Sequence, residues 1–461
     1  MAITTHTTNL IPKFWAYEGL KRLKSTYNMS KTVTTDFKNE IKEAGDTVHT
    51  NIPGNFTTQR RNDGDTYNRQ DATSTDVAIV LNQQIETTFI IYSGQASLSQ
   101  GELFDTFLDG AVDAINNGVN SMIMGAIPQF VPAAQYGGLN GFTSANAISK
   151  LVAAKQQAKN FKSNIAPYLA VTDNVEAAML NNATFNQANT SSDKGLTQMN
   201  GYLGQKFGLN MFAPYGLPYT NNLASLPFSG LVNGGKAAGQ TVIAYDNYDG
   251  TGGTGSSSSS SSSGGSGIVE YTPIVGSWVS FADSPLCYKI TAADLDEITI
   301  TPALVHAVTD DSVIEFARST TVVAGTAANF YLSIEVADLT YLEVGNPISI
   351  GSANYTIMSI DTANTKITLD RPLEALAAPS AVIGIMPSGN YNLCYRKDAI
   401  ALINRPLAMM PGADMYTASG TDASLTVTMH FDADVGGTVV TVETLVGVKV
   451  LDTNRGFLML G

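Results

Sequence analysis

The sequence predicts an α+β protein in which an all-β region interrupts a mixed domain. A long helical pattern follows Ser99, short β-branched runs fill residues 268–385, and helical and strand-like patterns occur on both sides of those runs. The 461 residues suffice for about three domains.

The first elements predict a helix and then a long ribbon. The segment LIPKFWAYEGLKRLKS is amphipathic, and residues 45–53 and 76–93 are strand-like, so they can pair as a hairpin whose tip lies near Arg60 and Arg61. A two-stranded arm is only marginally stable by itself. The arm therefore suggests self-assembly.

The next element is the clearest helix. Ser99 and Glu102 form a capping box, and Pro128 ends a pattern of about 26 residues, roughly 39 Å long. Its buried face is expected to hold the apolar positions from 104 to 126. Its polar face is expected to hold Asp105, Asp109, Asp113, Asn116 and Asn120.

Later segments predict packed helices at 144–161 and from 173 onward, and a C-terminal hairpin followed by a final strand. Residues 244–267 contain eight consecutive serines and predict a flexible tether. The runs in 268–385 alternate with period two and predict one small antiparallel barrel or sandwich.

The net charge and the distribution of basic residues argue against a protein that binds nucleic acid. The net charge is −14, and residues 243–385 hold 4 basic against 16 acidic residues, whereas the first 70 residues hold 10 against 7. Phosphate binding needs clustered Lys and Arg. Only 14% of residues are charged, which suits either surfaces that are buried against neighbouring subunits or a largely β architecture.

No catalytic, cofactor or metal motif is found. The cysteines Cys287 and Cys394 are expected to be free and buried. The acidic groups Asp294/Asp296/Glu297, Asp310/Asp311 and Asp432/Asp434 are interpreted as solvated turn carboxylates, with a weak calcium site left open. The start has no secretory pattern and no segment could span a membrane, so we expect a soluble protein made in a cytoplasm.

Taken together, these segments resemble the major capsid proteins of tailed bacteriophages, which have the Hong Kong 97-type fold, in the podovirus-like form with an inserted β domain. The resemblance rests on the order of the segments and on NLCYRKDAIALINRPL and ETLVGVKVLDTNRGFLMLG, which are similar to the family's returning and closing strands. It covers nearly the whole chain.

The resemblance implies a virion protein, made in the host bacterial cytoplasm, that forms pentamers and hexamers of an icosahedral shell around double-stranded DNA, without sequence-specific binding. By position it implies an N-terminal arm (1–45), an extended loop (46–93), a peripheral domain with a spine helix (94–142), an axial domain (143–243), the flexible segment (244–267), an inserted all-β barrel-like domain (268–385), and a second axial part with a β-hinge (386–461).

This sequence departs from the family pattern in two ways, and both bear on the partners that the resemblance implies. No lysine occurs between Lys42 and Lys150, so a lysine cross-link from the extended loop is excluded. Arg60, Arg61 and Arg69 are predicted to pair with carboxylates of an adjacent capsomer, or else to be solvated. Only about 45 residues precede the hairpin, which favours a separate scaffolding protein, besides a portal, over a fused pro-segment.

Two other classes of function stay open at this point. The first is a decoration, tail or adhesion protein with a β-rich receptor-binding domain, although the long helix and the helices after residue 143 argue against it. The second is an enzyme with an acidic site in the β insertion, for which no nucleophile, base and metal set is found.

Overall fold

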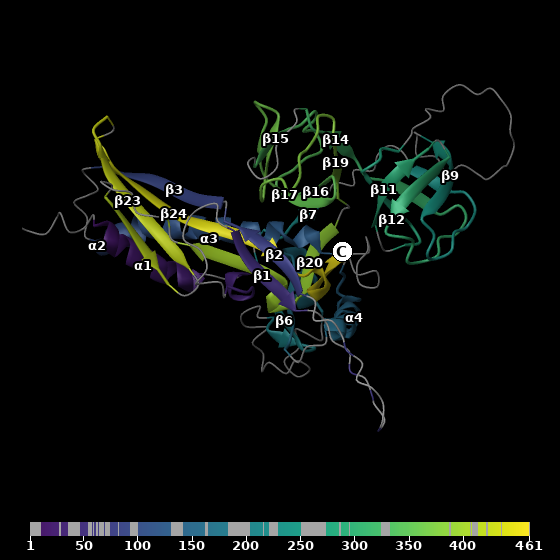
Figure 1. The fold of residues 1–461 in the computed structure, drawn as a ribbon, viewed down its shortest axis with the longest axis horizontal. Coiled ribbons are helices and arrows are strands. Elements are labelled where there is room, and N and C mark those ends of the chain that lie inside the picture. Colours follow the sequence, from purple (N-terminus) through teal and green to yellow (C-terminus); the bar gives the residue numbers. More distant parts are fainter. Residues whose placement is uncertain are drawn as a thin grey trace, which may run out of the picture. The chain divides into compact units, whose positions relative to one another are not determined.

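The computed structural model describes residues 11–26, 29–35, 47–53, 58, 60, 63, 69, 74–81, 83–92, 100–130, 142–161, 165–182, 203–214, 216–220, 229–249, 273–284, 287–294, 296–323, 332–386, 389–405, 407, 414–420, 423–434 and 436–460. The chain divides into two compact units, residues 1–123 with 397–452 and residues 124–396 with 453–461. Helices and strands occur in both units, which confirms the α+β class (Figure 1). No described helix is long and apolar enough to cross a membrane.

The first unit combines a helical layer with a sheet. Its helices are α1 (Pro12–Thr26), η2 (Met29–Lys31), α2 (Gln100–Leu103), the π-helical turn η4 (Phe104–Leu108), most of α3 (Asp109–Gly125), and η7 (Lys397–Ala399). Its strands are β1 (Thr47–Pro53), β2 (Ser74–Val80), β3 (Gln83–Tyr92), β21 (Ile400–Arg405), β22 (Met415–Ser419), β23 (Ser424–Asp432) and β24 (Gly437–Val450).

The longest strand, β24, organises the sheet of this unit. One edge of β24 pairs with β3 and the other with β23 and β21, and β22 follows β23. The expected C-terminal hairpin, β23 with β24, is thereby confirmed. The ribbon is confirmed only for β1 and β2, which pair from Thr47↔Val80 to Pro53↔Ser74.

The second flank of the predicted ribbon, residues 76–93, is two strands and not one. Beyond Leu81 the chain forms β3, which leaves the ribbon and pairs with β24. Phe89 explains the change, because its ring lies against Trp15 of α1 and is stacked on Phe107, with centroids 6.1 and 6.0 Å apart. The apolar residues of β3 therefore belong to the core of the first unit.

The long helix is confirmed as consecutive segments from Gln100 to Gly125, with Ser99 outside the described residues. Its predicted polar face is wrong at Asn116 and Asn120, which are buried. Asn120 donates to the Oδ1 atom of Asn116 at 3.4 Å, so one side chain partly meets the hydrogen-bonding needs of the other. The second half of the helix is covered on more sides than its sequence pattern indicates.

The N-terminal helix is joined to this long helix by charge. Arg22 of α1 contacts Asp105 at 2.8 Å and also Asp109, and Glu18 lies 3.3 Å away on its own helix. The hydrogen bonds that Arg22 donates to the two aspartates raise the pKa of Arg22 above its ordinary value. Asp105 lies within the π-helical turn, and turns of this kind are frequently found at functional sites.

The second unit contains a mixed sheet and two β-rich bodies. Its helices are η5 (Ile127–Gln129), α4 (Ala147–Ala158), η6 (Lys159–Phe161), α5 (Asp173–Leu180) and η8 (Thr453–Arg455). The mixed sheet has the order β25-β20-β4-β6-β5, formed by β25 (Gly456–Leu460), β20 (Gly389–Tyr395), β4 (Tyr168–Ala170), β6 (Leu209–Phe212) and β5 (Gln205–Lys206), and β7 (Tyr219–Thr220) pairs with β20.

The predicted helices 144–161 and 173 onward are confirmed as α4 with η6 and as α5, and the final strand as β25. Apolar residues of both helices share a core with β4, β6 and β25. The expected single segment 386–461 is divided, however. Its residues 397–452 belong to the first unit, because β24 pairs with β3, whereas β20 and β25 pair with each other in the second.

A closed six-stranded barrel begins earlier than the sequence indicated. It consists of β8 (Ser229–Val232), β9 (Val242–Asp249), β10 (Trp278–Phe281), β11 (Cys287–Ala293), β12 (Glu297–Thr301) and β13 (Val313–Phe316). The boundary at residue 268 is therefore wrong, because β8 and β9 pair with β13 and β12. Residues 244–249 belong to β9, and the serines of the expected tether lie outside the described residues.

The rest of the β region forms a second body, where one domain was expected. Its strands are β14 (Ser319–Thr321), β15 (Ser333–Glu335), β16 (Pro347–Ile350), β17 (Ala353–Asp361), β18 (Lys366–Leu369) and β19 (Val382–Ile385), in the order β14-β19-β16-β17-β18-β15. An antiparallel bridge between Val322 and Val336 joins the two end strands, so this sheet also closes. We call these bodies the first and second barrels.

A buried ion pair lies in the second barrel. Asp370 and Arg371 are 3% and 9% exposed, and their side chains are 2.9 Å apart. Asp370 also accepts from the backbone N–H of Thr356 at 2.8 Å, and the guanidinium of Arg371 lies 4.4 Å from the ring centre of Tyr355. Burial raises the pKa of Asp370 to about 6, although Arg371 opposes the rise.

We predict that Asp370→Asn destabilises the second barrel by about 3 kcal/mol at pH 7.5, because it leaves the buried Arg371 with only the partly exposed Glu374, 3.4 Å away, as a counter-charge. Limited proteolysis of the second barrel across a urea series measures the change, because neither Trp15 nor Trp278 lies in that barrel. The double variant Asp370→Asn with Arg371→Met should recover most of the loss, since it leaves no buried charge in the site and the remaining Glu374 is 40% exposed. Equal destabilisation in the two variants would contradict this account.

Candidate assembly surface

The ribbon formed by β1 and β2 is the feature that most suggests a partner. Among the described strands, it is a separate two-stranded sheet that pairs with no third strand. Its base is anchored, because Ile79 and Leu81 are fully buried in a cluster with Ala401, Ile403 and Leu445. Each outer edge offers unpaired backbone groups, which a strand or loop of another molecule could satisfy.

The predicted contact residues lie between these two strands. Arg60 and Arg69 are exposed and outside regular structure, while Arg61 lies outside the described residues. No described carboxylate is paired with Arg60 or Arg69, so their pairing across subunits stays a prediction. His49 and Asp76, one from each strand, lie 2.7 Å apart in the ribbon and are exposed, and sequence reasoning did not single them out.

Exposed aromatic side chains mark further surface of the first unit. Phe14 and Tyr17 on α1 are 52% and 51% exposed, although they lie one helical turn apart, where a buried stripe would be expected. The hydroxyl of Tyr17 is 2.9 Å from that of Tyr416 on β22. Phe431, near the end of β23, is 70% exposed. Apolar groups of this size gathered on a surface commonly mark contact with another protein.

The candidate chemical groups of the sequence do not assemble into a reactive site. Both cysteines are free and buried, as predicted, and burial raises the pKa of Cys287 to about 12. No group of three or more His, Cys, Asp or Glu able to hold a metal ion occurs among the described residues. Asp432 accepts from the backbone N–H of Asp434 at 2.9 Å, as expected for a turn carboxylate.

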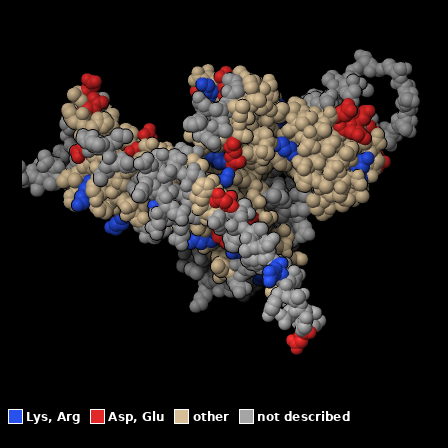
Figure 2. All heavy atoms as spheres, viewed as in Figure 1, with Lys and Arg blue, Asp and Glu red and all other residues tan. Residues whose placement is uncertain are grey.

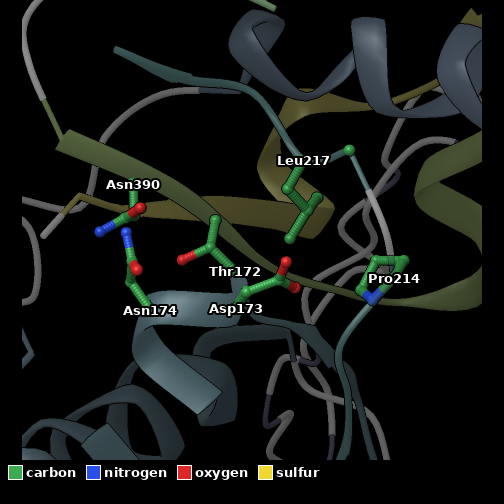
Figure 3. Close-up of a pocket in the computed structure, with 7 residues that line it drawn as sticks. Thr172, Asp173, Asn174, Pro214, Leu217 and Asn390 are labelled. Atoms are coloured by element: carbon green, nitrogen blue, oxygen red, sulfur yellow. The ribbon is translucent and has the colours of Figure 1, made fainter. Parts of the chain in front are cut away.

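A cavity of about 360 Å³ lies beside the start of α5 (Figure 3). It is lined by Thr172, Asp173, Asn174, Pro214, Gly216, Leu217 and Asn390. Asp173 is the one charged group among them, so the lining offers neither a second acid or base nor a thiol for catalysis. The backbone N–H of Thr172 is already bonded to Asn392 at 2.9 Å.

Acidic side chains gather on part of the first barrel (Figure 2). Burial, together with the charges of Asp311 and Asp310, raises the pKa of Asp246. Asp283 on the same barrel behaves oppositely. Its carboxylate accepts from both the hydroxyl and the backbone N–H of Thr309, the latter at 2.9 Å, and these bonds lower its pKa.

These two aspartates predict opposite effects of neutralisation. A raised pKa in the folded state means that stability falls as pH rises through that pKa, so Asp246→Asn should raise the melting temperature at pH 7 and have no effect near pH 3. A lowered pKa means that stability is gained as pH rises, so Asp283→Asn should lower the melting temperature at pH 7. Thermal scans at both pH values test this, and shifts of the same sign would refute it.

No protein-family model and no curated protein sequence matches the chain. Among solved structures, it is similar to one of Mycobacterium phage Che8, with 8% identity and a TM-score of 0.38 over 93% of this chain and 91% of that chain. It is also similar to the capsid structure of the Cyanophage P-SCSP1u, with 10% identity and a TM-score of 0.39 over 93% of this chain and 85% of that chain. A third similar structure is the mature capsid of bacteriophage PhiM1, with 10% identity and a TM-score of 0.38 over 93% of this chain and 84% of that chain. At these TM-scores, function has to be inferred from the chain's own residues.

Proposed function

We propose that this chain is the major capsid protein of a tailed bacteriophage, with the Hong Kong 97-type fold, and that its copies assemble as pentamers and hexamers into an icosahedral shell. The observation that carries the proposal is the ribbon β1–β2, a two-stranded sheet whose base is buried and whose edges pair with no other described strand. A ribbon of this kind gains stability when a neighbouring molecule covers it.

The remaining surface supports the same role. A charged fraction of 14% lowers the cost of burying large areas between subunits, because each buried charge needs a partner. The exposed aromatic residues Phe14, Tyr17 and Phe431 lie on the unit that carries the ribbon. In this role the chain acts by contact and not by catalysis.

The charge of the chain supports a role in enclosing nucleic acid. A net charge of −14 repels phosphate, so double-stranded DNA can be packed inside without adhering to the wall. A separate scaffolding protein and a portal would guide assembly in the host cytoplasm. We assign residues 1–45 to the N-terminal arm, 46–81 to the extended loop and 100–125 to the spine helix, because β3 leaves the ribbon and pairs with β24.

Expression of the chain together with its scaffolding partner should yield closed particles tens of nanometres across, visible by negative-stain electron microscopy. The chain alone should yield open or irregular assemblies, because the scaffold sets curvature. Closed particles of uniform size from the chain alone would remove the scaffold from the proposal. A dispersed, monomeric chain in both preparations would contradict the capsid role and favour a β-rich attachment protein.

Neutralising the ribbon arginines should weaken the shell without unfolding the subunit. We expect the triple variant Arg60→Gln, Arg61→Gln and Arg69→Gln to give fewer particles, and particles that dissociate at lower urea concentration, because contacts to carboxylates of the next capsomer are lost. The matched control changes three basic residues outside the ribbon to Gln: Lys155 of α4, Lys159 of η6 and Lys206 of β5. Sedimentation analysis decides, and equal behaviour of the triple variant and the unchanged chain would refute the contact.

A further inference from the structure

The first and second barrels have the same strand order. Numbered one to six along the chain, the strands of the first barrel are arranged in the cyclic order 3-4-5-2-1-6. The second barrel, closed by the Val322–Val336 bridge, has the same cyclic order. The equivalent bridge in the first barrel is the pair Val232↔Tyr245 of β8 and β9.

The agreement extends to single residues. The last 20 residues of each barrel, from Glu297 to Phe316 and from Lys366 to Ile385, correspond without a gap. The fifth strands begin at equivalent residues, although β12 is one residue longer than β18, and the sixth strands match in both their bounds and their pairings. The fourth strand of each barrel has its register shift at the same place, after Ile290 and after Ile357. Insertions and deletions are thus confined to the turns.

Details that a barrel does not require are also shared. Asp311 and Ser380 occupy equivalent positions and both have a positive φ, 62° and 66°, which is uncommon outside glycine. The hydroxyl of Tyr288 accepts from the backbone N–H of Val305 at 3.3 Å, and the hydroxyl of Tyr355 accepts from that of Glu374, the equivalent residue, at 2.8 Å.

The cores correspond as well, and each of the following residues is at most 2% exposed. The first barrel uses Val279, Tyr288, Ile290, Ile298, Ile300 and Leu304, and the second uses Ile348, Tyr355, Ile357, Ile367, Leu369 and Leu373. The sequence carries a matching trace, since VGSWVSF (275–281) and VGNPISI (344–350) share Val, Gly and Ser at three positions.

We infer that residues 229–386 are a tandem duplication of one six-stranded barrel and that its copies have taken different roles. The second copy is part of the body of the chain, and the first is a separable module held on the second. This inference does not depend on the proposed capsid role.

The two copies use the same strand position for attachment but bind different surfaces. In the second barrel, Thr356 lies 3.4 Å from the carbonyl oxygen of Gly125, at the end of α3, and donates to it, and Asn354 donates to that of Pro128 at 2.8 Å. A side chain on Gly125 would overlap that of Asp370, so the helix end and the barrel are closely packed.

The residue of the first barrel that is equivalent to Thr356 is Lys289, and it donates to the carbonyl oxygen of Gly351 in the second barrel. Trp278 adds a hydrogen bond to Ser349 at 3.0 Å. Where the second barrel has the buried pair Asp370 and Arg371, the first has Thr301 and Pro302. The first barrel therefore lacks the charged residues that accompany contact with the helix end.

The pairing of the terminal strands makes the first copy removable. Ser229 of its first strand lies opposite Glu315 of its last, so the chain enters and leaves this barrel at neighbouring points. Domains inserted through adjacent ends are tolerated, and can be excised, more readily than segments whose ends lie apart. Ser319 and Gly384 are paired in the same way in the second barrel, which provides a matched excision.

Two excisions from the full chain test the different roles. One removes residues 229–316 and joins 228 to 317 through a short Gly-Ser link, and the other removes 317–386 and joins 316 to 387. We expect the first variant to remain soluble, with the α-helical circular dichroism of the remaining chain. The second variant should be lost to aggregation, because it uncovers the end of α3. If both variants survive or both are lost, the division of roles is wrong.

A graft tests the duplication itself, in a chain that keeps both barrels. Residues 308–316 are replaced by a copy of residues 377–385, and the control uses a copy of 378–386, which is shifted by one residue. A one-residue shift turns every side chain of the strand to the opposite face. The in-register graft should keep the protease resistance of the first barrel and the shifted graft should lose it. Equal outcomes would overturn the equivalence of the two copies.

Discussion

Pairing between distant parts of the chain is the constraint on which both units depend. In the first unit, β24 pairs with β3 across about 350 residues of sequence, and in the second unit β25 pairs with β20, which itself pairs with β4. Neither central sheet is complete until the last 25 residues are available. The free chain is therefore exposed to premature association at its strand edges, a hazard that assembly partners can limit.

The two barrels avoid this constraint. Each is closed by strands within fewer than 90 residues, has its own core, and returns the chain close to where it entered. A second copy could therefore be added without disturbing β7 or β20, the paired strands that precede and follow the barrels in the chain. The copies then diverged where they contact their surroundings, at Asp370 and Arg371 in one and at Trp278 and Lys289 in the other.

Local patterns in the sequence predicted the long helix, α4, α5 and the C-terminal hairpin, since each is specified by neighbouring residues. The departure of β3 from the ribbon could not be read locally, because its partners Trp15 and Phe107 are distant in sequence. The barrel boundary was missed because the serine tract looks like a linker between domains. The match between Val275-Gly276 and Val344-Gly345 is too short to indicate a repeat by itself.

The capsid role depends on the completion of the ribbon β1–β2 by another copy of the chain. Hydrogen–deuterium exchange of the backbone amides in residues 47–53 and 74–80 tests this directly, with the dispersed chain and the assembled particles compared under the same conditions. The account predicts fast exchange along the outer edges in the dispersed chain and strong protection in particles. Equal exchange in the two states would mean that no neighbour covers the ribbon, and the capsid role inferred from it would fail.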